Sequence, residues 1–208
     1  MKRIVTIALI VSLIFTSSLF AANNAQNYDT ISLYVHGTLG LDALTNSLSI
    51  PKKSYSADRE GVIVKLGIDA YKNEDLGAKI GATAGLELDI PFRSVKSGTG
   101  LDLGKLPYLG LSGGMIFRSR PWDYIDVSLS LKGVASTYDY KAISLGIALE
   151  PTADIYFDDN IYMKVALSYG SDIVKFPFKG DDYLVISNLP SHFSISLGAG
   201  FAFGGYSK

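Results

Sequence analysis

Apolar and polar residues alternate one by one along most of the chain beyond residue 30. The longest such run covers residues 76–90, where every even position is apolar and no odd position holds a large apolar side chain. A period of two is typical of a β-strand with two different faces, because a helix would scatter these residues around its axis. The pattern predicts a strand over this segment.

The same alternation recurs seven more times, so the sequence predicts eight strands. The other seven cover residues 31–39, 62–71, 109–118, 125–132, 143–157, 161–169 and 193–203. The connections between the strands follow a second pattern. They are short after the second, fourth and sixth strands (72–75, 119–123, 158–160) and long after the first, third and seventh (41–60, 91–106, 171–191), with 135–140 intermediate. Short turns at one end and long loops at the other are typical of transmembrane barrels.

Alternation alone does not say whether the apolar face meets lipid or a protein core, and a soluble secreted barrel or sandwich is the alternative. Two features favour lipid. The polar rows are rich in Gly, Ser and Ala, which suit the narrow interior of an eight-stranded barrel. Aromatic residues also gather near the predicted strand ends, as in a membrane girdle: Tyr71, Phe117, Trp122, Tyr124, Phe157, Phe201 and Phe203 by the short turns, and Phe92, Tyr108, Tyr169 and Phe193 at the other end. We therefore expect an all-β, eight-stranded antiparallel up-and-down transmembrane β-barrel.

The first residues read as an export signal. Lys2 and Arg3 precede the apolar stretch 4–15, and a cleavage site follows Ala21. This pattern is typical of a secretory signal peptide. It predicts two parts, a signal peptide at 1–21 and an outer-membrane barrel domain at 22–208.

Composition excludes several function classes. Nineteen Lys and Arg residues against 20 Asp and Glu residues give a net charge of −1, without the basic excess that nucleic-acid binding needs. The chain has no cysteine, which excludes disulfides, thiol catalysis and cysteine-ligated metal sites. No phosphate-binding loop or metal-ligand spacing appears. We expect no cofactor, no metal and no nucleic-acid partner.

With these strands and a last strand that ends on aromatic residues (193–203), the chain resembles the small eight-stranded outer-membrane barrels of the OmpA transmembrane-domain, OmpX and OmpW type. The resemblance implies the outer membrane of a diderm bacterium, with membrane lipids and the insertion machinery as partners. That family includes structural anchors, adhesins, small hydrophobic-solute channels and a few lipid-modifying enzymes, so the resemblance does not choose a function.

The polar rows carry charges of both signs in near balance. Near balance favours a lumen closed by ion pairs over a selective pore, with a gate or proton path as the alternative. The predicted network comprises Lys65, Asp69, Lys79, Glu87, Asp89, Arg118, Asp126, Lys132, Glu150, Asp154 and Lys164.

Two histidines suggest chemistry. His36 lies on a polar row, and His192 with Ser194 forms a His-x-Ser pair that resembles the pair of outer-membrane lipid A deacylases. Residues two apart share a strand face, so the hydroxyl could approach the imidazole. Here that face is the lumenal one, whereas acyl-chain chemistry faces lipid, so we expect no enzymatic activity.

The long connection 171–191 is rich in apolar and aromatic residues. We interpret it as a hairpin that extends the last two strands beyond the membrane, with Phe176, Phe178 and Tyr183 as candidate binding residues. The sequence thus predicts a structural or surface-interacting, adhesin-like role through extracellular loops, with a host surface or external ligand as partner. A narrow channel for small hydrophobic molecules and a lipid-modifying enzyme are the alternatives.

Overall fold

The computed structural model describes residues 31–45, 59–72, 78–94, 107–138, 142–177 and 191–203. The predicted signal peptide lies outside these residues and stays a prediction. Eight strands make up almost all of the described chain: β1 (Ile31–Thr45), β2 (Arg59–Lys72), β3 (Ala78–Ser94), β4 (Tyr108–Trp122), β5 (Ile125–Tyr138), β6 (Ala142–Tyr156), β7 (Ile161–Pro177) and β8 (Ser191–Phe203).

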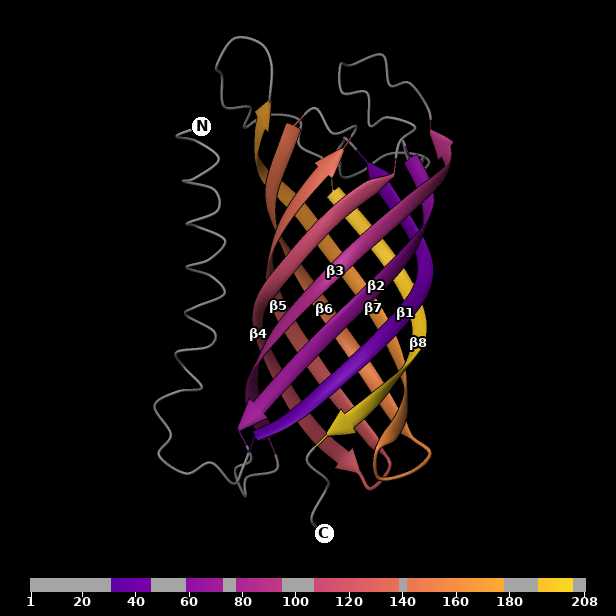
Figure 1. The fold of residues 1–208 in the computed structure, drawn as a ribbon, viewed down its shortest axis with the longest axis vertical. Coiled ribbons are helices and arrows are strands. Elements are labelled where there is room, and N and C mark those ends of the chain that lie inside the picture. The colour runs from indigo at the N-terminus through magenta and orange to yellow at the C-terminus, as the bar shows by residue number, and fades with distance from the viewer. Residues whose placement is uncertain are drawn as a thin grey trace, which may run out of the picture.

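The strands close into one antiparallel barrel. Each strand pairs with its neighbours in sequence, and β1 also pairs with β8 over thirteen register positions from Leu33↔Phe203 to Thr45↔Ser191. Figure 1 shows the strands tilted around a common axis, with the start of β1 and the end of β8 at the lower end of the view. The tight connections lie at this end too, and we call it the short-turn end. The predicted eight-stranded antiparallel barrel is confirmed. Within the described part of the chain, no helix is long and apolar enough to cross a membrane.

Most strands extend beyond the bounds predicted from the alternation. The prediction placed residues 41–45, 91–94 and 135–138 in connections, but all are strand, and β7 continues to Pro177. At the other end, β4 reaches Trp122, and only the turn residues Asp123 and Tyr124 separate it from β5. Extra ladder pairs, such as Asp42↔Gly61, satisfy backbone groups that a loop would leave to water.

The outer wall is apolar and the interior is polar. Large apolar side chains of every strand point outward and are 37–62% exposed, whereas most buried side chains on the described strands are polar or charged. This reverses the arrangement of a soluble domain and suits a barrel whose wall meets lipid, since closure leaves no unpaired strand edge.

Most of the expected aromatic girdle is present on this wall. Trp122, Tyr124 and Phe157 are exposed near the tight turns, and Phe92 is exposed at the other end. Two members of the expected set were wrong, because Tyr71 and Tyr108 are only 1% and 2% exposed and face the lumen. On its strand, each tyrosine belongs to the row of alternate residues that faces the lumen, not to the row that faces lipid.

Candidate functional site in the barrel lumen

The inward-facing charges occupy the lumen at several levels. Nine of the eleven residues proposed from sequence are buried, whereas Lys79 and Glu87 are half-buried. The buried nine are Lys65, Asp69, Asp89, Arg118, Asp126, Lys132, Glu150, Asp154 and Lys164.

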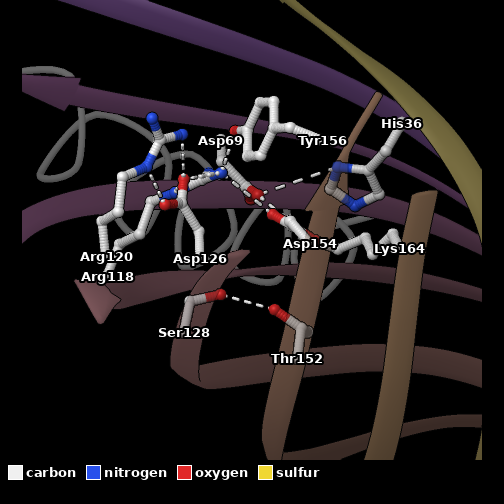
Figure 2. Close-up of polar contacts among 10 residues, drawn as sticks. All are labelled: His36, Asp69, Arg118, Arg120, Asp126, Ser128, Thr152, Asp154, Tyr156 and Lys164. Atoms are coloured by element: carbon white, nitrogen blue, oxygen red, sulfur yellow. Dashed lines mark hydrogen bonds and ion pairs between the residues drawn. The ribbon is translucent and has the colours of Figure 1, made fainter. Parts of the chain in front are cut away.

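Arg118 is the centre of a network near the short-turn end. Its Nη2 lies 2.7 Å from Asp126 Oδ2 and 3.1 Å from Asp154 Oδ2, and it also donates to the Tyr156 hydroxyl. Arg120, which lies in a predicted turn (119–123), binds the same Asp126 from the next inward position of β4. Two guanidinium groups therefore share one buried carboxylate (Figure 2).

Lys164 links this cluster to the far side of the lumen. Its Nζ lies 3.2 Å from Asp154 Oδ1 and 3.7 Å from Asp69 Oδ2. Asp69 in turn lies 3.7 Å from His36 Nδ1. Figure 2 shows the resulting chain of contacts from the arginines through Asp154 to His36. Side chains of β1, β2, β4, β5, β6 and β7 thus meet in one place.

Tyrosines fill the space around Arg118. The Arg118 Cζ lies 4.0 Å from the Tyr34 ring centroid and 5.2 Å from that of Tyr71, within the range of cation–π attraction. Tyr34 meets Tyr71 edge-on at 5.3 Å, and Tyr156 meets Tyr162 at 5.4 Å. We call the cluster of these four rings and the charged side chains around Arg118 the inner seal. Its charged members are Arg118, Arg120, Asp126, Asp154, Lys164 and Asp69. Sequence reasoning missed the rings because it examined only the charges on the inward rows.

Glycines make room for these rings. Gly200 is the register partner of Tyr162, and Gly81 is the register partner of Tyr71. A Cβ on either glycine would overlap the facing tyrosine ring. These two glycines therefore mark where large side chains cross the lumen.

A separate ion-pair group lies closer to the barrel centre. Glu150 accepts from Lys65 Nζ at 3.0 Å and from Lys132 Nζ at 2.6 Å. All three side chains are less than a tenth exposed. One carboxylate therefore forms ion pairs with two buried ammonium groups, one from β2 and one from β5.

The end toward the long connections, which we call the outer end, has charges that the sequence reading missed. Arg59 pairs with Asp89 at 2.9 Å, and His192 Nε2 lies 3.3 Å from Asp172 Oδ1. Asp42 is also buried there. Arg59, Asp42 and Asp172 had been assigned to loops. The alternation that continues through Leu39, Leu41 and Ala43 was the signal that would have placed Asp42 on the inward face.

Two hollows lie in the lumen beyond the inner seal. The smaller, with a cavity volume of about 10 Å³, is lined by His36 and Lys164 at the edge of the seal and by the Glu150 group. The larger, with a cavity volume of about 30 Å³, is at the outer end and is lined by Asp42, Tyr108 and His192 among others. The lumen is thus packed at one end and hollow toward the other.

The candidate loop residues are only partly covered. Phe176 belongs to β7, pairs with Ile143 of β6 and is partly buried, which agrees with the expected extension of the strand. Phe178 and Tyr183 lie outside the described residues, so their binding role stays a prediction.

The sequence matches no protein-family model and no curated protein, but the fold matches solved barrels. Neisserial surface protein A is 10% identical over 82% of this chain and 97% of that chain, with a TM-score of 0.55. Ail of Yersinia pestis is 12% identical over 84% and 99%, with a TM-score of 0.42. OprG of Pseudomonas aeruginosa is 14% identical over 86% and 99%, with a TM-score of 0.45.

The likeness to the Neisserial protein shows the fold, and the lipid-facing wall is the chain's own evidence for a membrane. The chain is a small eight-stranded β-barrel of the bacterial outer-membrane type. Its place is the outer membrane of a diderm bacterium.

Proposed function

We propose that the protein is a non-conducting, non-enzymatic barrel that acts at the cell surface, where its outer end contacts an external ligand or host surface. The inner seal is the observation that carries this proposal. Arg118, Asp126, Asp154 and Lys164 are each at most 3% exposed and cross-link opposite walls of the lumen. An eight-stranded barrel has just enough interior for its side chains, so such a network leaves no continuous path.

The alternatives fit the lumen less well. A channel for small hydrophobic molecules needs an apolar path, but the lumen carries buried charges at three levels. A lipid-modifying enzyme of the deacylase kind needs its His and Ser to face lipid, whereas Ser194 is 3% exposed and turned inward.

Recording in planar bilayers tests the seal. We expect little or no steady current from the unmodified protein. A triple Tyr34→Ala, Tyr71→Ala, Tyr162→Ala variant removes three rings of the seal and serves as the control that current through this barrel can be detected. Large, regular channels in the unmodified protein would contradict the proposal.

Shortening the last long connection tests the surface role. Residues 175–177 pair with β6, so the deletion must spare them. Replacing residues 179–188 with Asn-Gly should leave a heat-modifiable barrel, because hairpin closure tolerates changes in loop length.

The shortened protein should adhere less to cultured epithelial cells when it is displayed on bacteria. A matched shortening of the connection at 95–106 is the control for a general effect of loop loss. Unchanged adhesion after the first deletion would contradict this loop assignment and shift attention to residues 46–58.

A further inference from the structure

The outer end of the lumen holds a histidine between two carboxylates. His192 belongs to β8, which pairs on one side with β7, the strand of Asp172, and on the other with β1, the strand of Asp42. The His192 Nε2 lies 3.3 Å from Asp172 Oδ1. Asp42 is the register partner of Ser194, two residues from His192 on the same face of β8. One imidazole therefore lies between two carboxylates that belong to different strands.

Asp42 lacks an ion pair of its own. It is 4% exposed, its buried Oδ2 has no hydrogen-bond partner, and no ion pair joins it to any residue that the structure describes. Its register partners, Gly61 and Ser194, are uncharged. A buried carboxylate is unfavourable unless a positive charge lies close to it, so the charge of His192 matters to Asp42.

The cations of β2 are paired with other carboxylates. Arg59 lies 2.9 Å from Asp89 of β3, and Lys65 Nζ lies 3.0 Å from Glu150. Lys65 is also the register partner of Glu87 of β3. Lysine and arginine side chains keep their charge across neutral pH, so they contribute a constant field at this end.

The other elements add no further carboxylate to this hollow. On β7, Lys175 follows Asp172 by three residues and lies nearer to the strand end. Tyr108 of β4 packs against His192, with ring centroids 5.9 Å apart. The described residues of β5 and β6 that line the hollow are uncharged: Val134, Gly146, Ile147 and Ala148. Among all these side-chain types, only histidine ordinarily changes its charge between about pH 5 and 8.

Little water lies among these charges. The hollow that they line has a cavity volume of about 30 Å³, room for about one or two water molecules. Charges in such a place are screened much less than charges on an open surface. A change in the charge of His192 therefore has a large effect on the two carboxylates beside it.

The protonated and neutral forms of His192 act on the strand ends in opposite ways. With a proton, the imidazolium attracts Asp172 and Asp42 from either side and draws β7 and β1 toward β8. Without it, the carboxylates repel each other across a neutral ring. Only one described ladder position of β8 lies beyond His192, namely Ser191, so few backbone pairs resist separation there. A histidine that gains negative partners on folding stabilises the fold at low pH, and this contribution is lost as the pH rises.

We propose that this cluster is a pH-sensitive latch: protonated His192 ties the outer ends of β7, β8 and β1 together at acid pH, and its neutral form lets them open as the pH rises. β7 and β8 are also the strands that the connection 178–190 joins, so the latch sets how firmly the two ends of that connection are held. The latch does not depend on the proposed surface role, because a barrel without an external ligand would have it too.

Amide hydrogen exchange of the full barrel in lipid nanodiscs, at pH 6 and at pH 8, tests the latch. Rates are expressed as protection factors, which remove the pH dependence of the exchange chemistry itself. We expect amides at 42–44 and 192–194 to be about tenfold more protected at pH 6, the equivalent of one charge-assisted hydrogen bond. Amides at 116–118 and 162–164, in the inner half, should show no such change.

Two variants assign the effect to the histidine and to the carboxylate. His192→Gln keeps a hydrogen-bond donor near Asp172 but takes up no proton, so the difference between the two pH values should vanish. Asp42→Asn removes one of the opposed charges, so the strand ends should stay protected at pH 8. His36→Gln is the matched control, because the chain's other histidine lies 3.7 Å from Asp69, next to the inner seal, and its loss should leave the effect intact.

A second measurement uses only the unmodified protein. The imidazole nitrogen resonances of His192 should show a protonated ring at pH 6 and a neutral ring at pH 8. An unchanged ring, equal protection of the outer strand ends at both pH values, or greater protection at pH 8 would overturn the latch. A pH effect that persists in His192→Gln would also overturn it and assign the proton to Asp42. None of these outcomes bears on conductance or adhesion, so a failure of the latch and a failure of the surface role can be told apart.

Discussion

The inner and outer ends of the lumen are built by the same eight strands, yet they are filled in opposite ways. At the inner end, Arg118, Arg120 and Lys164 interleave with buried carboxylates, and tyrosine rings occupy the remaining space. At the outer end, Arg59 pairs with Asp89 and His192 with Asp172, but no ion pair joins buried Asp42 to a residue that the structure describes, and the larger hollow remains. The comparison teaches that charge pairs and packed rings close one end of the lumen, whereas the other end is less completely filled.

The difference arises from side-chain size on the inward rows. Many inward positions of the outer half hold small residues: Gly61, Gly110, Ser136, Ser144, Gly146, Ser168, Gly170 and Ser194. In the inner half, Gly81 and Gly200 each face a tyrosine ring of the neighbouring strand.

The largest expected effect comes from removing the central cation of the seal. Arg118→Ala leaves Asp126 and Asp154 as buried charges with fewer partners, and should lower the free energy of unfolding by about 3–5 kcal/mol. Denaturant titration in lipid vesicles, read by heat-modifiability on gels, measures the loss. Lys79→Ala is the control, because Lys79 is only half-buried and should cost much less. Equal losses would show that the seal has no special role in stability.

A smaller effect is expected from a glycine that faces a tyrosine. Gly200→Ala would push a methyl group into the Tyr162 ring and should cost about 1–3 kcal/mol. Gly113 is buried, but the nearest atom to an added Cβ is 3.7 Å away. Gly113→Ala should therefore gain about 0.5–1 kcal/mol, because alanine is better than glycine within a strand. The same unfolding titration compares the two variants, and a loss in both would contradict the packing argument.

The smallest effect concerns a hydroxyl pair in the inner half. Ser128 and Thr152 are buried and hydrogen-bonded to each other across β5 and β6 (Figure 2). Ser128→Ala leaves the Thr152 hydroxyl without this partner and should cost about 1 kcal/mol. Adding Thr152→Val should restore much of the loss, because both polar groups are then gone. If the double variant loses the sum of two single losses, the pair is not coupled.

The strands and their faces could be predicted because period-two alternation is a local property. Leu66, Ile80 and Leu129 face outward and Lys65, Asp126 and Lys132 face inward, as their parity indicates. Ion-pair partners could not be predicted in this way. Lys65 meets Glu150 across 85 residues, and strand tilt and register in the closed barrel decide which inward positions share a level.

The lumenal residues that the sequence did not predict fall into two groups. Asp42, Arg59 and Asp172 lie where strands extend past the expected membrane span, so their segments were interpreted as loops. Tyr34 and Tyr162 were recognised as part of their strands, but their role in filling the lumen depends on the facing glycine or alanine of a strand distant in sequence.

Thiol accessibility along the lumen tests the central claim most directly, since the chain has no cysteine of its own. Ser168→Cys places a thiol in the outer hollow, Ser128→Cys places one in the inner half, and Leu129→Cys faces lipid. A membrane-impermeant, water-soluble thiol reagent is added outside intact cells. Rapid labelling at position 168, with little at 128 and 129, is the predicted result. Labelling at 128 as fast as at 168 would show an open lumen and contradict the account.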